Sequence, residues 1–304
     1  MPSTVERLTR MQLISPPSWL VANVMYETIM GSVAFGVSTD ISDFDTVGFC
    51  IPPKDMVFPH LAGRIEGFGR QKQRFSCYQK HHVLVQDELG GKGRVYDLNV
   101  YNIVHYFHLC MENNPNMIAT LFTPQECVLH STKVANMVRD ARRSFLHKGA
   151  WHRFKGYAYN QLHKMRTKEP DPDSKRAEIV ERHGYDVKFA YHIVRLLSEI
   201  EQILAEGDLD IRRNRAQLKA IRRGEVPEEE ILRWASEKEK SLEKLYEESK
   251  LPYGPDEKAI KRLLLSCLEE HWGSIDNCVV TDDLPVSALR EIADVIDRNR
   301  RLLG

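Results

Sequence analysis

Two aspartates, Asp43 and Asp45, stand one residue apart in the segment SDFDTVGFC. The segment reads as a β-strand that ends before Pro52-Pro53, because proline cannot donate to a ladder. Side chains alternate across a strand, so both carboxylates would project from one face while Phe44 points to the other. Two such charges repel by about 1 kcal/mol in water and by more when partly buried. A divalent cation such as Mg²⁺ would remove the repulsion. The alternative is a strand edge with both acids in solvent.

A Gly-Ser pair, Gly31-Ser32, precedes the aspartates by about ten residues. A tight turn at this pair would expose backbone N–H groups and a hydroxyl that can hold a phosphate. Gly36 keeps the following segment free of bulk. A phosphate-binding turn shortly before a metal-binding strand is the layout needed to present a nucleoside triphosphate to metal ions.

A two-metal site of this kind needs a third carboxylate from a neighbouring strand. Asp97 is the candidate, since it lies in the strand-like run GRVYDLNVY and is flanked by Val95, Tyr96 and Leu98. A single acid in a strand also serves as a register or turn feature, and that reading stays open for Asp97.

These residues resemble the motif of the DNA polymerase β superfamily of nucleotidyltransferases: an apolar residue, Gly-Ser, about ten residues, then Asp-x-Asp. More narrowly, the chain resembles an RNA-repair-associated family of predicted nucleotidyltransferases from bacteria and phages (RlaP-like). The matching segments keep their order over roughly residues 25 to 265. They are GSVAFGVSTDISDFDTVGF, Asp97 leading into NNPN, FKGYAYNQLHKM, GYDVKFAYHIVRLL, LKAIRRGEV and KLPYGPD.

The resemblance implies that Asp43, Asp45 and Asp97 are the catalytic residues and the metal ligands. Asp43 and Asp45 would bridge two Mg²⁺ ions, with Mn²⁺ as an alternative, and Asp97 would hold the ion that activates the attacking hydroxyl. Gly31 and Ser32 would bind the terminal phosphates. Three features depart from the pattern: Thr46 replaces an apolar residue, Ile118-Ala119 replaces a Glu-Leu pair, and the last forty residues have no counterpart.

The segment GYDVKFAYHIVRLL predicts an amphipathic helix. Lys188, His192 and Arg195 fall at i, i+4 and i+7 and form one polar stripe. A solvated helical face is the alternative interpretation. In a superfamily whose helical domain closes over the nucleotide, Lys188 would neutralise the triphosphate, and Tyr185, His192 and Arg195 are further candidates for nucleotide binding.

Other candidate chemistry is weaker. His105 and His108 lie at i, i+3 without a third metal ligand, so we interpret them as packing residues. His81 and His82 lie in a basic stretch and should be exposed. GGKG lacks the spacing of a P-loop and predicts a turn. The six cysteines include no CxxC pair, which argues against a zinc cluster or a disulfide framework and favours free thiols.

Composition excludes several classes of protein. The 304 residues are 42% hydrophobic and 28% charged with a formal net charge of zero. No apolar run approaches the roughly 20 residues that span a bilayer, so we expect no membrane partner. The start, MPSTVERLTR, lacks the apolar core of a secretion signal, and we expect a cytoplasmic protein. With no net charge, any affinity for nucleic acid must come from local patches.

The two halves of the chain differ in composition and in hydrophobic periodicity. Residues 20 to 130 combine strands, helices and turns, with a helix after Asn102 and a surface hairpin in RIEGFGRQKQRFSCYQKHH. From residue 131 the periodicity is helical, at about 131–148, 150–167, 184–206, 227–249, 256–271 and 286–302. The resulting prediction is an α+β fold: a polymerase-β-type palm with a mixed sheet over residues 1–130, and an all-helical domain over residues 131–304 that closes over the nucleotide and contacts the acceptor.

The leading hypothesis is an enzyme that transfers a nucleotide from an NTP such as ATP to an RNA 3′ end, because the genetic company of the family points to RNA repair. Two basic patches support an RNA partner through counterion release, although each also reads as a solvated surface. They are Arg64/Arg70/Lys72/Arg74/Lys80 and the run from Arg212 to Arg223. The alternatives are nucleotidylation of a protein or small molecule and, less favoured, a non-catalytic nucleotide-binding module. The oligomeric state is not readable.

Overall fold

The computed structural model describes residues 2–38, 43–58, 74–168 and 175–274, and the single positions 60, 65, 289 and 292. Its contacts divide the chain into two units. The first unit comprises Met1–Pro52 and Phe75–His271 and carries every predicted site residue. The second comprises Pro53–Arg74 and Trp272–Gly304. Within it, α4 (Lys54–Val57) is followed by Phe58, whose ring lies 5.8 Å from that of Trp272.

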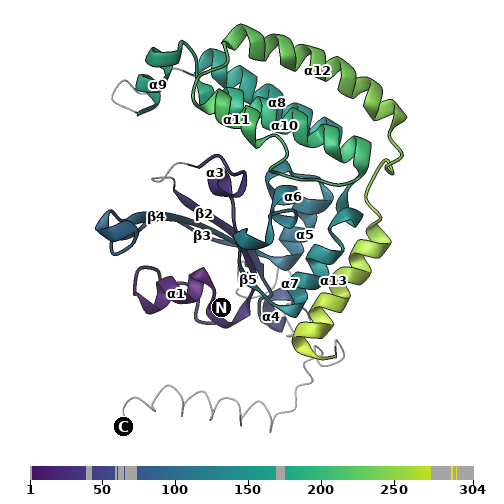
Figure 1. Cartoon of the computed structure of the whole chain (residues 1–304). Helices are drawn as coiled ribbons and strands as arrows, with labels where there is room; N and C mark the ends of the chain where they lie inside the picture. Colours follow the sequence, from purple (N-terminus) through teal and green to yellow (C-terminus); the bar gives the residue numbers. More distant parts are fainter. Residues whose placement is uncertain are drawn as a thin grey trace. The chain divides into compact units, whose positions relative to one another are not determined.

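A five-stranded mixed sheet forms the centre of the first unit (Figure 1). Its strands are β1 (Val24–Ile29), β2 (Phe44–Cys50), β3 (Cys77–Val85), β4 (Arg94–Asn102) and β5 (Val128–Ser131). They lie in the order β3-β4-β2-β1-β5. The central pair β2/β4 is parallel, and the other three pairs are antiparallel. Strand β3 follows β2 in the sequence but lies at the edge of the sheet. Strand β4 then runs back between them and pairs with β2 in parallel.

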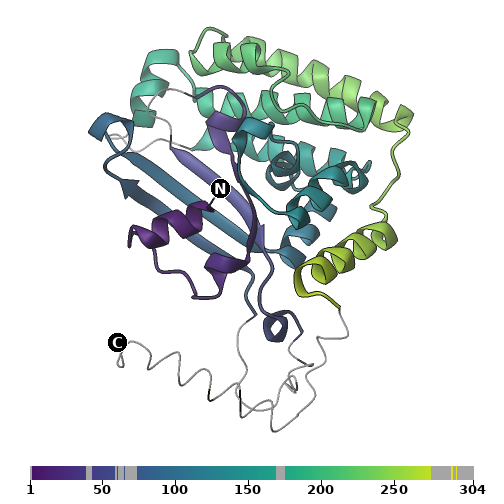
Figure 2. The same cartoon turned by 60° about the horizontal axis from the view of Figure 1, so that its bottom comes forward.

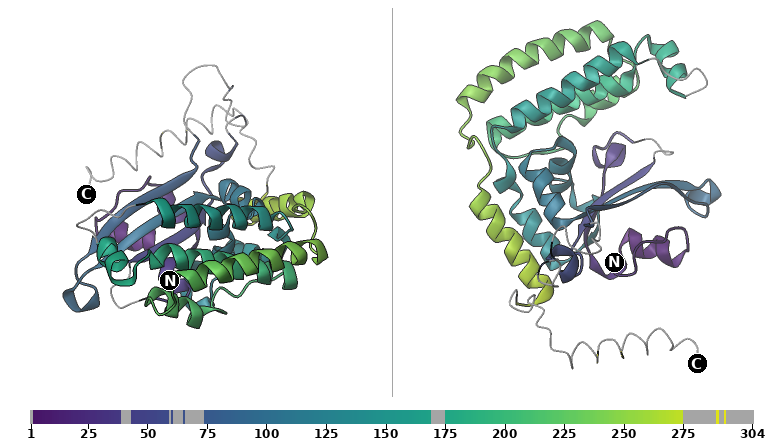
Figure 3. Two further views of the ribbon diagram at one scale, coloured as in Figure 1. Left: turned by 90° about the horizontal axis from the view of Figure 1, so that it is seen from above. Right: turned by 180° about the vertical axis from the view of Figure 1, so that it is seen from behind.

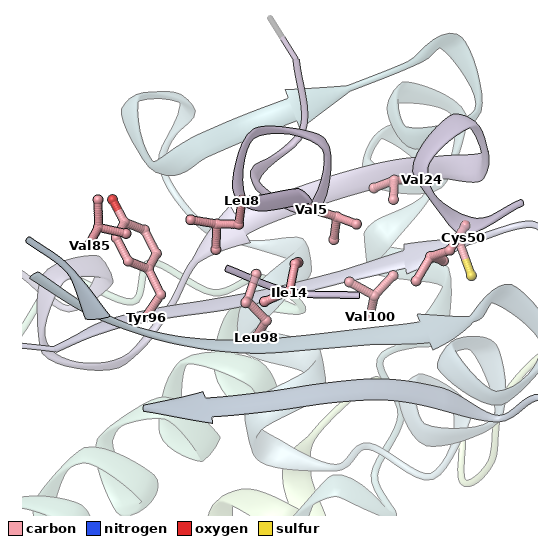
Figure 4. Packing of buried hydrophobic residues seen from close by; sticks show 10 residues of the cluster. Val5, Leu8, Ile14, Val24, Cys50, Val85, Tyr96, Leu98 and Val100 are labelled. Carbon is pink, nitrogen blue, oxygen red and sulfur yellow. The ribbon is translucent and has the colours of Figure 1, made fainter. Parts of the chain in front are cut away.

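One face of the sheet is covered by α1 (Thr4–Arg10), which lies across the strands in Figure 2. Alternate β4 residues, Tyr96, Leu98 and Val100, point into this layer and pack with Val5 and Leu8 of α1 (Figure 4). The intervening residues of β4 therefore project from the opposite face. Asp97 is one of these, so burial of the apolar set fixes the face on which the acid lies.

The opposite face is covered at one end by α5 (Ile103–Met111) and α6 (Pro115–Leu121). The ring of Phe49 on β2 lies 4.8 Å from Tyr106 on α5 and 5.8 Å from Tyr26 on β1. The short helices α2 (Leu20–Asn23), α3 (Gly31–Ala34) and α7 (Lys133–Asp140) connect or flank the strands. So do three 3₁₀ turns, η2 (Leu89–Gly91), η3 (Gln125–Cys127) and η4 (Arg142–Phe145).

Helices dominate the remainder of the first unit (Figure 3). They are α8 (Ala150–Thr167), α9 (Lys175–His183), α10 (Val187–Glu206), α11 (Arg215–Arg222), α12 (Glu228–Glu248) and α13 (Glu257–Trp272). Because α10 packs against α8, α11 and α12, 15 of its 20 residues are buried. Helix α10 is thus the core element of this helical part. No helix in the described part of the chain is long and apolar enough to cross a membrane.

The predicted α+β class is confirmed, as are the strands at β2 and β4 and the helix at α5. The helices predicted at 150–167, 184–206, 227–249 and 256–271 correspond to α8, α10, α12 and α13. The one predicted at 286–302 lies outside the described residues apart from two positions. The division at 130/131 falls within β5 and stays a prediction. The five cysteines that the structure describes are free thiols, as expected.

The predicted surface hairpin is described only in part. Residues 77–82 belong to β3, which forms a hairpin with β4. The turn between them is the segment around GGKG, as expected for a turn. Residues 64 and 66–73 of the predicted hairpin lie outside the described residues.

Candidate active site

Two of the three predicted carboxylates lie opposite each other at the centre of the sheet. Asp45 on β2 and Asp97 on β4 are register partners on the parallel pair, so their side chains project from the same face. Asp43 directly precedes β2 and is exposed. The structure thus brings the third acid next to Asp45, as the sequence predicts.

The Gly-Ser turn lies against Asp45. Gly31 has φ +62°, a backbone region that side chains rarely adopt, and a Cβ there would stand 1.9 Å from Oδ2 of Asp45. The preceding Met30 donates its N–H to the Asp45 carbonyl at 2.7 Å. Glycine is therefore required at position 31 both by the turn and by the carboxylate. Ser32 follows as the second residue of α3 and is half-buried.

The pKa of Asp45 reflects its burial and the charged groups around it. Burial raises the pKa of the Asp45 carboxyl above its usual range, and the negative charges of Asp97 and Asp43 raise it further. The positive charges of Lys188 and His81 act in the opposite direction. An excess of negative charge at one point on the sheet favours a bound cation.

Asp97 is held by an irregularity in the neighbouring strand. The β3/β4 register shifts between Lys80 and Val83, and His82 has φ +57°. The backbone N–H of His82 thereby turns to Oδ1 of Asp97 at 2.7 Å. Nδ1 of His81 lies 3.7 Å from the same oxygen. The bulge thus fixes the third carboxylate, as β-bulges next to active sites often do.

Lys188, on helix α10 of the helical part, acts electrostatically on the carboxylate of Asp45. Asp186 caps α10 by accepting from the N–H groups of Lys188 at 2.9 Å and Phe189 at 3.2 Å, and Arg176 pairs with the same Asp186. This cap fixes the first turn of α10, where the Lys188 side chain is exposed. Its positive charge acts to lower the pKa of Asp45.

The other predicted nucleotide-binding residues lie inside the protein. Tyr185 is 6% exposed and donates its hydroxyl to the Val226 carbonyl at 2.6 Å. Arg195 is 5% exposed and lies over the ring of Phe35, next to Glu199. Both side chains thus contact other parts of the protein, and their role in nucleotide binding stays a prediction.

His192 is also drawn inward. Burial lowers the pKa of His192 to about 3, and the charges of Arg195 and Lys188 lower it further. Its imidazole is therefore neutral at physiological pH. It can form a hydrogen bond but adds no charge to offset a triphosphate.

The sequence analysis missed His81 as a site residue, although it correctly placed His81 and His82 on the surface. The signal was the turn around Gly90. Counting back from it pairs Val85 with Arg94 and Val83 with Tyr96, which leaves His81 and His82 opposite Asp97.

Whether the residues fit a metal ion can be judged from their chemistry. In the part of the chain that the structure describes, no three His, Cys, Asp or Glu side chains converge to form a metal site by themselves. Mg²⁺ is usually bound through one or two carboxylates together with water and substrate phosphates. The residues fit a magnesium site that the substrate completes. They are the facing carboxylates of Asp45 and Asp97, the nearby Asp43 and the Gly31 turn in contact with Asp45.

The basic run from Arg212 to Arg223, which flanks and includes α11, is partly neutralised. Arg212 pairs with Glu126, Arg213 with Glu206 and Arg223 with Glu225. Arg212 also donates to the Ala34 carbonyl at 2.8 Å and so ties the segment to α3. These three arginines act within the protein. In the other predicted patch, Arg64, Arg70 and Lys72 lie outside the described residues.

In comparisons with solved structures, curated proteins and protein families, the chain matches one family over most of its length. Among solved structures, a nucleotidyltransferase-like protein from Exiguobacterium sibiricum matches with 12% identity and a TM-score of 0.28, over 88% of this chain and 73% of that one. No curated protein matches significantly. Residues 5–266 match the family described as RlaP, RNA repair pathway DNA polymerase beta family. This match spans the sheet, the three carboxylates and the helices through most of α13, and the chain therefore belongs to the RNA repair pathway DNA polymerase β family.

Proposed function

We propose that this chain transfers a nucleotidyl group from an NTP to the 3′ hydroxyl of an RNA and releases pyrophosphate. The observation that carries the proposal is the facing pair Asp45 and Asp97 with the Gly31 turn packed against it. This arrangement supports the proposal, because a turn that could bind phosphate lies in contact with carboxylates that could bind a cation, as the transfer of a nucleotide requires. Membership of an RNA repair family supports RNA as the acceptor.

In the proposed reaction, the acceptor oxygen forms a bond to the α-phosphorus, the bond from that phosphorus to the pyrophosphate oxygen breaks, and the hydroxyl proton passes to solvent. Asp43, Asp45 and Asp97 would hold Mg²⁺. When bound, Mg²⁺ neutralises the phosphates and lowers the pKa of the acceptor hydroxyl. The backbone N–H groups after Gly31 and the hydroxyl of Ser32 bind the terminal phosphates.

The chain supplies the remaining charge from its helical part. Lys188 projects from the first turn of α10 toward Asp45 and offsets the negative charge of the triphosphate. Tyr185, His192 and Arg195 position this helix from inside. We propose accordingly that residues 131–304 act as the part that covers the nucleotide, with residues 1–130 as the catalytic part.

The direct test is incorporation of label. The chain is incubated with Mg²⁺ and each of the four α-labelled NTPs, with tRNA and an unstructured RNA as acceptors. We expect label in RNA that resists protease, and none with a doubly substituted Asp45→Asn/Asp97→Asn chain. Label that resists nuclease and is removed by protease would identify a protein acceptor instead. Undiminished labelling by the doubly substituted chain would refute the proposed site.

A further inference from the structure

A cavity of about 480 Å³ lies on the same sheet face as the carboxylates. Strand β3, the end of β4 and helices α5 and α6 border it, it is open to solvent, and its lining includes Ser76, Cys77, Gln79, Tyr101, His105 and Asn116. Its volume is within the range of sites for small organic ligands, about 300–1,000 Å³. It belongs to neither the phosphate turn nor the carboxylate pair.

The cavity lies farther along β4 than the carboxylates. Asp97, Asn99 and Tyr101 alternate on one face of this strand, and Tyr101 pairs with Cys77 of β3. Tyr101 lies four positions after Asp97 in the strand, which is about 13 Å at the usual rise of a strand. A group seated against Tyr101 is thus one nucleoside length from the reacting centre.

The position of the cavity distinguishes acceptor from donor. The Gly31 turn touches Asp45 on β2, whereas the cavity lies over β4 and β3, and β4 lies between β2 and β3 in the sheet. In phosphoryl transfer the attacking and leaving oxygens lie roughly in line on opposite sides of the phosphorus. If the pyrophosphate is held at Gly31, the attacking hydroxyl therefore arrives from the side of β4 and β3, the two strands that line the cavity.

The lining indicates an uncharged ligand with polar edges. None of the residues that line the cavity is Lys, Arg, Asp or Glu, so the lining does not favour a phosphate or another ion. It presents the amides of Gln79, Asn114 and Asn116 and the hydroxyl of Ser76. In the described part of the chain, the side chains of Gln79 and Ser76 make no hydrogen bond, so both are available to a ligand.

An aromatic pair forms one wall. The rings of Tyr101 and His105 meet edge to face with centroids 5.5 Å apart. Nδ1 of His105 is buried and has no hydrogen-bond partner among the described residues. A ligand at this wall could form a hydrogen bond with it. Aromatic side chains of this kind bind unstacked bases, and amides bind their hydrogen-bonding edges.

We propose that this cavity holds the terminal nucleoside of the RNA acceptor, with its base against Tyr101 and His105 and its polar edge toward Gln79 and Asn116. The inference rests on the proposed function and adds the place at which the acceptor end is read. Because Asn116 accepts from Arg195 of α10 at 3.3 Å, the cavity is also linked to the helix that carries Lys188.

Two variants test the assignment by kinetics. Gln79→Met keeps the size of an exposed side chain and removes its amide, while Tyr101→Leu removes the stacking ring. Loss of base stacking costs about 1–3 kcal/mol, so we expect KM for the RNA acceptor to rise roughly 5- to 150-fold for Tyr101→Leu, and less for Gln79→Met. KM for the NTP should not change. Gln86→Met, on an exposed residue just after β3, is the matched control and should behave as the unsubstituted chain.

A second measurement does not depend on turnover. An RNA that ends in 4-thiouridine is irradiated with the chain in the absence of metal, and the crosslinked peptide is sequenced. We expect the crosslink within residues 75–117 and its loss on Tyr101→Leu. Failure of the unsubstituted chain to label any RNA would refute the proposed function. An active chain whose KM for RNA is unchanged in both variants, or whose crosslink lies elsewhere, would overturn this inference alone.

Discussion

Asp45 and Asp97 stand opposite each other on adjacent parallel strands, with both carboxylates on one face of the sheet. Like charges placed this way weaken strand pairing. The strands are held together regardless, since burial of Leu98 and Val100 against α1 fixes their register. The fold therefore keeps a destabilising pair at the place where the proposed reaction needs it, a conflict typical of active sites.

This conflict predicts opposite effects of one substitution on stability and activity. Asp45→Asn removes one charge of the pair while keeping its size. We expect nucleotide incorporation to fall below a thousandth of its original rate, because the proposed metal site loses one of its ligands. We expect the free energy of unfolding at pH 8 without metal to rise by up to about 1 kcal/mol. Urea denaturation followed by circular dichroism measures the second effect.

The matched control is Asp87→Asn, on an exposed residue of the turn between β3 and β4. It should leave both incorporation and unfolding unchanged. A drop in stability of the Asp45→Asn chain would show that Asp45 is held by attractive contacts and that repulsion from Asp97 and Asp43 does not dominate.

The Gly31 turn predicts a second separation of effects. Gly31→Ala places a Cβ 1.9 Å from Oδ2 of Asp45 on a backbone with φ +62°. The left-handed backbone alone costs roughly 1–2 kcal/mol, and displacement of the carboxylate adds to it. We expect a loss of more than about 2 kcal/mol in unfolding free energy, together with loss of incorporation.

Gly90→Ala provides the comparison, because Gly90 has φ +67° and a Cβ there meets no atom within 4 Å. It should lose only the part that is due to the backbone. In the double variant Gly31→Ala/Asp45→Ala, part of the stability should return, since the clashing carboxylate is gone. Equal losses for Gly31→Ala and Gly90→Ala would contradict the packing of the turn on Asp45.

The catalytic strand and its partner could be predicted because their signals are local. The apolar residues Tyr96, Leu98 and Val100 of β4 alternate with Asp97, so Asp97 falls on the face away from α1. Asp45 is the register partner of Asp97 and shares that face. The Gly-Ser turn followed by Asp-x-Asp is likewise a local pattern. Helices α8 and α12 were predictable within a residue or two from their periodicity and from the prolines and glycines around them.

Long-range relationships could not be predicted in this way. The N–H groups of Thr4 and Val5 donate to the fully buried carboxylate of Glu27 on β1, and this contact fixes α1 on the sheet. Nothing near either segment indicates it. The bulge that turns the His82 N–H to Asp97 depends on the register of two strands, and β5 is too short and polar to show a pattern.

The helix α10 shows why a pattern can mislead. Lys188, His192 and Arg195 form a polar stripe on a helical wheel, which implies one solvated side. The helix is instead packed by α8, α11 and α12, so of this stripe only Lys188, in the first turn, is exposed. The number of neighbours of a helix is a property of the fold, and periodicity within the segment does not reveal it.

Lys188 should act on Asp45 before any substrate binds. Its charge lowers the pKa of Asp45, so Lys188→Met should raise that pKa in the metal-free chain. A ¹³C NMR titration of the Asp45 carboxyl measures this shift. In the proposed reaction the same variant should raise KM for the NTP roughly 10- to 100-fold, since a hydrogen bond to a charged group contributes about 1.5–3 kcal/mol.

Lys258→Met, on an exposed residue of α13, is the control for loss of one positive charge and should change neither quantity. Lys188→Arg keeps the charge and should restore the pKa of Asp45. An unaltered pKa in Lys188→Met would mean that the lysine does not face the carboxylates.

The buried carboxyl of Glu199 predicts the pH dependence of stability. Burial raises the pKa of Glu199 to about 7, although the positive charge of Arg195, 3.5 Å away, opposes the rise. Neither oxygen of Glu199 has a hydrogen-bond partner among the described residues. Between its unfolded pKa near 4.5 and about 7, the folded chain binds the extra proton. The contribution of Glu199 to stability is therefore present below pH 4.5 and is lost as pH rises to 7.

Glu199→Gln mimics the protonated side chain, so its melting temperature should match that of the unsubstituted chain at pH 5 and exceed it at pH 8. Each kcal/mol corresponds to roughly 2–4 °C for a chain of this size class. Differential scanning calorimetry at the two pH values measures the difference, with Glu229→Gln on the exposed side of α12 as the control. A variant that is less stable than the unsubstituted chain at pH 8 would show that attraction to Arg195 outweighs the burial of the charge.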